Sequence, residues 1–276
     1  MIIDSHNHFW KYTAADYGWI DESMSVIRRD FLPGDLRESL ESAKVDGCIA
    51  VQARQSLDET HWLQGLASEN AFIRGVVGWV PLISDHVKRE LESVGSDPKL
   101  RGVRHVLQDE ADEQYMARDD FNRGIAVLKE FGLAFDLLVF ERQLPTVLRL
   151  VDRHPEQIFI LDHIGKPKIK ANEREPWTKH IQELSKRPNV YCKVSGLVTE
   201  ADWQSWTTPG LLEYFNIVLE AFGIGRVMAG SDWPVCLVAC GYNRWWDILR
   251  QWVSGLPETE QAQFLGENAI KAYGLK

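Results

Sequence analysis

The chain has 276 residues, of which 45% are hydrophobic and 26% are charged, and its formal net charge is −9. This balance is typical of a globular protein with enough apolar material for a sizeable core. The negative charge offers no basic field to nucleic acid or anionic lipid, so neither is expected as a partner. The four cysteines form no CxxC pair, and Cys48 and Cys192 lie in apolar runs typical of core residues in a reducing compartment.

No apolar run approaches the roughly 20 residues needed to span a bilayer. The first residues also lack the basic and then apolar pattern of a secretory signal. We therefore expect a soluble, cytoplasmic protein with no membrane contact.

The sequence opens with an apolar pair, Ile2-Ile3, that leads into two histidines one residue apart, His6 and His8. On a β-strand, side chains two residues apart point to the same face, so both imidazoles would enter one space. Converging neutral imidazoles can ligate a metal ion, or they can orient a reacting carbonyl or water. Two ordinary surface histidines would give the same local pattern, so the rest of the chain must decide.

A long loop follows, over residues 9–33. Its aromatic residues are Phe9, Trp10, Tyr12, Tyr17, Trp19 and Phe31. Aromatic rings are costly to leave in water, so the loop is expected to fold over another part of the protein. Packing on the rim of the core and closure over a substrate are both consistent with this pattern.

Beyond the loop, short apolar runs alternate with helical patterns to the end of the chain. With the opening strand there are eight such runs, at 2–8, 48–51, 73–80, 100–106, 133–139, 158–163, 190–196 and 226–232. Near-continuous apolar strands separated by helices indicate a parallel sheet covered by helices. Eight units in a chain of this length predict an α/β fold, a (β/α)8 TIM barrel, in a single domain over residues 1–276. A doubly wound open sheet is the alternative, but no GxGxxG follows any strand.

In a barrel of this kind the chemistry lies at the carboxyl ends of the strands. The polar and aromatic residues at these ends are His6, His8, Gln52, Trp79, Arg104, His105, Asp162, His163, Lys193, Ser195, Asp232 and Trp233. A buried charge must be paired or must change its pKa, so this many polar ends are hard to explain as core. A lone His163 would more often be a core histidine, but with His6, His8 and Asp232 it indicates a site of converging titratable groups.

Three motifs give the chain a family resemblance. IDSHNH at 3–8, LDHIGKP at 161–167 and GSDWP at 230–234 resemble the amidohydrolase superfamily. With VQA at 51–53 and GVRH at 102–105, the whole chain resembles the sugar-lactone hydrolase branch, which includes L-fuconolactonase-like and L-rhamnonolactonase-like proteins. This resemblance implies an amidohydrolase-like TIM barrel that opens a small sugar lactone to its acid. It also implies that His6, His8, His163 and Asp232 form the catalytic constellation.

The resemblance leaves the metal content open. Superfamily members with two metals use a lysine or carboxylate from the fifth strand as a bridge, whereas here that run has only Asp136, in its middle. The lactonase branch also includes members that work without metal. We therefore expect no ion or one zinc-like divalent ion, with His6, His8, His163 and Asp232 as its ligands, and no two-metal site.

The expected mechanism uses Asp232 as general base toward water, followed by return of the proton to the departing ring oxygen. Donors to the oxyanion would come from the histidines, Arg104, Lys193 or a bound cation. The residues expected to bind substrate are Gln52, Trp79, Arg104, His105, Lys193 and Trp233. Substrates of first choice are the 1,4- and 1,5-lactones of L-fuconic, L-rhamnonic and L-galactonic acid.

Three alternatives stay open at this point. A metal-dependent decarboxylase of the same superfamily would share the paired histidines and the late aspartate. A dicarboxylate-type lactonase would want several arginines at strand ends, and only Arg104 is clearly placed, with Arg54 just beyond the second strand. A barrel that binds a sugar acid without turnover is the non-enzymatic alternative. A homo-oligomer is compatible with each of these functions.

Overall fold

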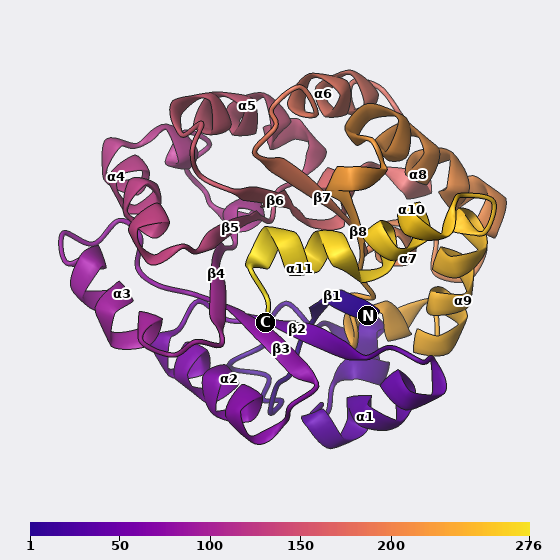
Figure 1. Ribbon diagram of the computed structural model, residues 1–276, viewed down its shortest axis with the longest axis horizontal. Coiled ribbons are helices and arrows are strands. Elements are labelled where there is room, and N and C mark those ends of the chain that lie inside the picture. The colour runs from indigo at the N-terminus through magenta and orange to yellow at the C-terminus, as the bar shows by residue number, and fades with distance from the viewer.

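Eight parallel strands form the centre of the structure, a computed structural model that describes residues 1–276 (Figure 1). The strands are β1 (Ile3–Asn7), β2 (Gly47–Val51), β3 (Ile73–Gly78), β4 (Leu100–His105), β5 (Ala134–Leu137), β6 (Phe159–Leu161), β7 (Val190–Val194) and β8 (Val227–Ala229). They pair in chain order, each with the next, from β1 to β8. The predicted strand runs and the (β/α)8 TIM barrel are therefore confirmed.

The ring closes between its first and last strands, at their carboxyl ends. The backbone N–H of Asp232 donates to the carbonyl of His6 over 2.8 Å, and that of His8 donates to the carbonyl of Trp233 over 2.7 Å. Asn7 and Trp233 form a parallel bridge at the same place. This closure brings the histidine pair of β1 beside the aspartate that follows β8.

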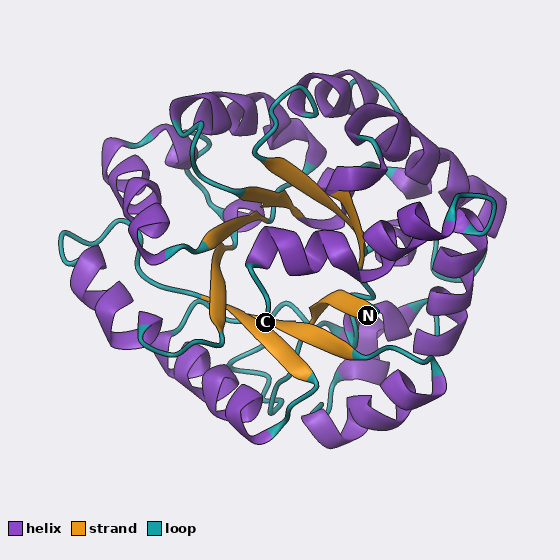
Figure 2. Ribbon diagram, in the orientation of Figure 1, coloured by secondary structure: helices purple, strands orange, loops and turns teal.

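Helices surround the strands on all sides in Figure 2. They are α1 (Pro33–Ser42), α2 (Leu57–Glu69), α3 (Val87–Gly95), α4 (Asp119–Leu128), α5 (Leu144–Arg153), α6 (Trp177–Leu184), α7 (Leu197–Glu200), α8 (Thr208–Phe222), α9 (Tyr242–Val253), α10 (Glu258–Ala262) and α11 (Asn268–Tyr273). Helix α5 illustrates why they form, because Leu144, Val147 and Val151 recur at helical spacing and are fully buried against the barrel. None of the helices combines the length and apolar character that crossing a bilayer requires.

Helix α11 covers the end of the barrel at which the strands begin. In Figure 1 it lies across the ring of strands, next to both chain termini. Its Ala269 and Tyr273 belong to the same apolar cluster as Ile3, Val77 and Met228 of the strands. Because this end is plugged, a ligand must enter from the opposite end, where the strands finish.

The aromatic loop before α1 packs against the protein. Trp10 and Phe31 exchange two backbone hydrogen bonds of 2.9 Å, and their rings meet edge to face at 5.7 Å. Trp10, Tyr17 and Phe31 are all buried, whereas Trp19 is 44% exposed. Rim packing therefore accounts for most of the loop, and Trp19 remains available to a ligand.

Candidate active site

A cavity of about 160 Å³ opens at the carboxyl ends of the strands. Its titratable lining residues are His8, Arg104, Asp109, His163, Lys166, Glu200 and Asp232, and its apolar ones are Trp19, Ala53, Val106, Leu138 and Val235. The cavity therefore combines acid–base groups with apolar surface, as small-molecule sites commonly do.

The ring nitrogens of the β1 histidines converge on Asp232. His6 Nε2 and His8 Nε2 are 3.2 Å apart, and they lie 3.7 Å and 3.4 Å from Asp232 Oδ1. Ligands bound tetrahedrally at 2.0–2.1 Å would be separated by roughly 3.3 Å. The three atoms thus have the spacing of a three-ligand metal site with one open position, and the donor set fits a zinc-like ion.

Hydrogen bonds on the far sides of these rings bear on which nitrogen carries a proton. His8 Nδ1 lies 2.8 Å from the carbonyl oxygen of Val51, which can only accept, so Nδ1 carries the hydrogen and Nε2 keeps a lone pair. His6 Nδ1 lies 3.3 Å from a carboxylate oxygen of Asp162, which favours the same tautomer. Two facing lone pairs 3.2 Å apart would suit a shared cation.

A second proton arrangement needs no ion and replaces the His6–Asp162 hydrogen bond with one from Lys193. Lys193 Nζ lies 3.2 Å from His6 Nδ1 and can donate to it. The hydrogen of His6 is then on Nε2, from which it can be donated to His8 Nε2. The donor set is thus suited both to a single ion and to a hydrogen-bonded acid–base cluster.

His163 also approaches Asp232. Its Nε2 is 4.0 Å from Asp232 Oδ1, and its Nδ1 is 2.9 Å from the hydroxyl oxygen of Ser195, just beyond β7. Both His163 (φ 52°) and Asp232 (φ 61°) have left-handed backbone conformations that are uncommon outside glycine. Such conformations concentrate at functional sites, where the surrounding structure holds them.

A chain of buried ion pairs lies beneath the histidines. Lys193 Nζ contacts Asp136 at 2.6 Å and Asp162 at 3.0 Å, and all three side chains are inaccessible to solvent. Arg104 binds the other oxygen of Asp162 at 3.1 Å, and Tyr273 of α11 donates to Asp136 over 2.7 Å. Two carboxylates and two cations therefore balance each other in the barrel interior, which buried charges require.

Burial and neighbouring charges determine the protonation states at the site. Burial lowers the pKa of His163 to about 4, against the opposing charge of Asp232, so the imidazole is neutral at pH 7. Burial acts to raise the pKa of Asp232, but the interactions with His163, His8 and His6 outweigh it and hold that pKa below its usual range. Asp232 is therefore an ionised carboxylate that faces the neutral imidazole of His163 at neutral pH.

Asp4 anchors the Asp232 segment to β1. Its carboxylate accepts hydrogen bonds from the Ser231 backbone N–H at 2.8 Å and from the Ser231 hydroxyl at 2.6 Å. The Tyr242 hydroxyl adds a third contact at 3.1 Å. Asp4 is fully buried outside the cavity lining, so its role is to position Asp232.

The six residues predicted to bind substrate do not lie together in the structure. Of the six, only Arg104 lines the cavity. Gln52 and Lys193 are fully buried, and Gln52 accepts from Arg104 through its carbonyl and its side-chain oxygen, the latter at 3.0 Å. Trp79 and His105 do not line the cavity.

His105 lies between Trp79, whose indole N–H is 3.3 Å away, and Glu110 at 2.5 Å. Trp233 packs its ring against Phe9 and Phe31. His105 and Trp233 are therefore engaged in contacts within the protein, away from the cavity lining.

Several lining residues were not predicted as site residues, although Trp19 lies in the predicted aromatic loop. They are Trp19, Gln108, Lys166, Thr199 and Glu200. Lys166 lies within the HIGKP motif, and Thr199 and Glu200 follow Ser195-Gly196 closely, so proximity to these motifs was the available signal. All five belong to irregular segments or short helical turns, where apolar periodicity gives no orientation.

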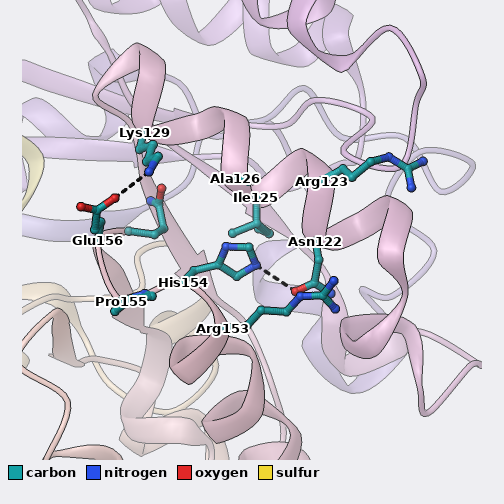
Figure 3. A pocket seen from close by; sticks show the side chains of 10 residues that line it. Asn122, Arg123, Ile125, Ala126, Lys129, Arg153, His154, Pro155 and Glu156 are labelled. Carbon is teal, nitrogen blue, oxygen red and sulfur yellow. Dashed lines mark hydrogen bonds and ion pairs between the residues drawn. The ribbon is translucent and has the colours of Figure 1, made fainter.

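A larger hollow of about 430 Å³ lies elsewhere, between α4 and the segment that leads from α5 to β6 (Figure 3). Its His154 contacts Asn122 at 2.8 Å, and its Lys129 pairs with Glu156 at 2.6 Å. These groups satisfy each other, and no predicted site residue lines the hollow. The acid–base chemistry therefore belongs to the barrel mouth.

Comparison with known proteins defines the family. A family model described as Amidohydrolase matches residues 3–275, so the chain belongs to the amidohydrolase family. An L-fucono-1,5-lactonase from Burkholderia multivorans is 43% identical over 100% of this chain and 96% of its own length. An L-fucono-1,5-lactonase from Burkholderia ambifaria is 38% identical over 86% of this chain and 81% of its own.

The similarity extends to three dimensions. A crystal structure of an amidohydrolase from Burkholderia multivorans with bound zinc superimposes with a TM-score of 0.97 at 40% sequence identity, over 100% of both chains. The superposition covers all eight strands and the segments that carry the histidine and aspartate constellation.

Proposed function

We propose that this protein is a lactonase that opens an aldono-1,4- or 1,5-lactone to the corresponding sugar acid. L-fucono-, L-rhamnono- and L-galactono-lactones are the substrates of first choice. The observation that carries the proposal is the ionised Asp232, which three imidazoles surround in a cavity that also has apolar surface. The relatives named L-fucono-1,5-lactonases support the same substrate class.

Asp232 acts as the general base. Its carboxylate is ionised at neutral pH and lines the cavity, so it can take a proton from a water molecule held between it and the lactone carbonyl. General-base assistance of this kind contributes on the order of 100- to 10,000-fold to a rate. Asp232 then returns the proton to the ring oxygen as the carbon–oxygen bond breaks.

His163 is the hydrogen-bond donor to the developing oxyanion, and Arg104 stabilises it through its charge. When the Ser195 hydroxyl donates to His163 Nδ1, the hydrogen of the neutral imidazole is on Nε2, which is directed toward Asp232. Arg104 adds a permanent positive charge at the cavity wall. Lys193 is not assigned this role, because it is fully buried between two carboxylates.

His6, His8 and Asp232 would hold a divalent ion if one is bound, whereas His163 belongs to a second group of closely spaced ligand atoms, with His6 and Asp162. A bound ion would supply Lewis-acid polarisation of the carbonyl and lower the pKa of water. The Val51 carbonyl orients the His8 ring in either case, whereas the His6 ring is oriented by Asp162 when an ion is bound and by Lys193 when none is.

The charge of the cavity disfavours a dicarboxylate substrate. Its two permanent cations, Arg104 and Lys166, are already paired with Asp162 and Glu200 at 3.1 Å and 3.4 Å. Neither is free to bind a second carboxylate of a substrate. Ala53, Val106 and Leu138 offer apolar contact that suits the C–H face or the methyl group of a deoxysugar.

A pH-indicator screen of sugar 1,4- and 1,5-lactones tests the proposal. We expect acid release from at least one five- or six-carbon aldonolactone, well above the spontaneous rate. If no lactone in a broad panel is opened, while a benzoate-type acid is decarboxylated or another ester is hydrolysed, the assignment is wrong.

A further inference from the structure

We propose that Thr199 and Glu200, together with Lys166 and Gln108, form a recognition wall that selects neutral, polyhydroxylated lactones. This inference rests on the proposed function and names the residues that determine specificity at that site. The recognition wall is defined by these four side chains, all of which line the cavity at the barrel mouth.

The first observation is a pair of buried polar atoms that have no partner. Thr199 Oγ1 and Gln108 Oε1 are both shielded from solvent, and neither makes a hydrogen bond within the protein. Buried polar atoms in folded proteins are nearly always paired, so each unpaired one requires an explanation. Because both residues line the cavity, we assign a hydroxyl group of a bound ligand as the missing partner, which a small rotation of either side chain would reach.

Hydrogen bonds to the backbone of these two residues hold their segments in place. The indole N–H of Trp203 donates to the carbonyl of Thr199 over 2.9 Å, and the backbone N–H of Gln108 donates to the carbonyl of Leu138 over 3.0 Å. The Gln108 amide also donates to Asp109 over 3.3 Å, which leaves its oxygen free. A site whose buried polar groups bond a substrate hydroxyl strongly rejects an analogue that lacks it, because those groups are then left unpaired.

The second observation is the ion pair of Glu200 and Lys166. Their charged atoms are 3.4 Å apart, and the side chains are only 23% and 16% exposed. The pair leaves carboxylate capacity on Glu200 for sugar hydroxyls, since a carboxylate can accept several hydrogen bonds. It also neutralises Lys166, which therefore gives no net attraction to an anionic substrate.

The charges that line the cavity also favour a neutral substrate. Asp109, Glu200 and Asp232 are its acidic residues, and both cations are already paired. A lactone with a second carboxylate would meet repulsion without a compensating cation, whereas a neutral lactone would meet hydrogen-bond acceptors. The wall therefore both attracts hydroxyl groups and rejects anions.

The wall is built into the segments that carry His163. Ser195 bonds the His163 ring, Gly196 turns the chain, and α7 then places Thr199 and Glu200 in the cavity lining. Lys166 donates its backbone N–H to the carbonyl of His163 over 2.9 Å. The position of the wall is thus coupled to that of the catalytic imidazole.

Glu200→Gln and Thr199→Val test the inference, with three probes. The first probe is a hydroxylated sugar 1,5-lactone. The second is δ-valerolactone, which has no ring hydroxyl. The third is the monolactone of an aldaric acid, which carries a free carboxylate in addition to the lactone. For the sugar lactone we expect kcat/KM to fall about 10- to 100-fold in Glu200→Gln and about 2- to 10-fold in Thr199→Val. For δ-valerolactone both variants should stay close to the unaltered protein.

The aldaric monolactone should change in the opposite direction. Glu200→Gln removes a repelling charge and frees Lys166, so kcat/KM for the aldaric monolactone should itself rise above that of the unaltered protein. Glu213→Gln is the matched control, because Glu213 pairs with Arg174 at 2.7 Å outside the cavity, and it should change none of these ratios.

Equal effects on the sugar lactone and on δ-valerolactone, or no effect on either, would overturn the recognition wall while leaving lactone hydrolysis intact. If the unaltered protein opens no lactone at all, the proposed function fails, and this inference fails with it.

Discussion

The α-carbon of Gly196 lies directly against the imidazole of His163. A methyl group at position 196 would be 2.7 Å from His163 Nδ1, and the backbone φ of Gly196 is +70°. Only glycine satisfies both the conformation and the close approach without strain. The turn after β7 is therefore part of what holds His163 toward Asp232.

Gly196→Ala should lower kcat by about 100-fold or more, because the added methyl displaces the His163 ring from its productive position. Gly132→Ala is the matched control, since Gly132 has a similar φ of +65° but empty space around its α-carbon. We expect Gly132→Ala to lose about 1–2 kcal/mol of unfolding free energy and Gly196→Ala to lose at least as much, and only Gly196→Ala to lose turnover. Equal turnover in the two variants would contradict a positioning role for Gly196.

Substitution of Lys193 tests whether this residue stabilises the fold or binds substrate. Lys193→Met would leave Asp136 and Asp162 without the cation between them, and breaking a buried pair in this way costs about 3–5 kcal/mol. Chemical denaturation should show this loss, and Lys193→Met combined with Asp136→Asn should recover part of it. A variant of unchanged stability with a raised KM would instead support the substrate-binding role that the sequence suggested.

The metal prediction follows from β5. Its carboxyl end has Leu138 and Val139 instead of a ligand, and Asp136 is already bound by Lys193 and Tyr273. We expect metal analysis and zinc titration to give at most one ion per chain, with loss of uptake in His8→Ala. Chelation should leave full activity, or activity that one equivalent restores. Two ions per chain, both required for turnover, would contradict this account.

Glu59 gives a prediction about pH and stability. Its carboxylate accepts from the backbone N–H groups of Ala53 and Arg54 at 3.0 Å and 2.8 Å, but burial outweighs these bonds and raises its pKa from 4.5 to about 7. The folded state therefore binds the proton more tightly than the unfolded chain, so this contribution to stability is lost as pH rises through 7.

Glu59→Gln should remove that pH dependence. Between pH 5 and pH 8, the stability of the unaltered protein relative to the variant should fall by about 2–3 kcal/mol. Urea unfolding of both proteins at the two pH values measures the difference directly. A constant difference across this range would mean that Glu59 is ionised throughout.

Period-two alternation on β1 predicted that His6 and His8 share a face, and the order of apolar runs predicted the barrel. The shared face depends on the local sequence pattern, and the barrel is one of the few folds that eight alternating strands and helices can form. Asp232 and His163 were found because they follow strands within recognisable motifs. Their approach to the histidines depends on closure of the ring, which eight units imply.

How deeply each side chain lies inside the barrel could not be predicted from the sequence pattern. Lys193 ends a strand just as Arg104 does, yet it lies beneath His6 because Asp136 and Asp162 bind it there. Thr199 and Glu200 reach the cavity through a turn at Gly196, and no periodic pattern encodes that geometry. Cytoplasmic location and homo-oligomeric assembly stay predictions.

The role of Asp232 as general base is the central claim, and Asp232→Asn tests it most directly. This change keeps the size of the side chain and an acceptor oxygen but removes the basic carboxylate. We predict that the variant folds, binds the product acid like the unaltered protein and loses about 100-fold or more in kcat. A folded Asp232→Asn variant that retains most of its turnover would contradict the account and would move the search for the base to His6, His8 and His163.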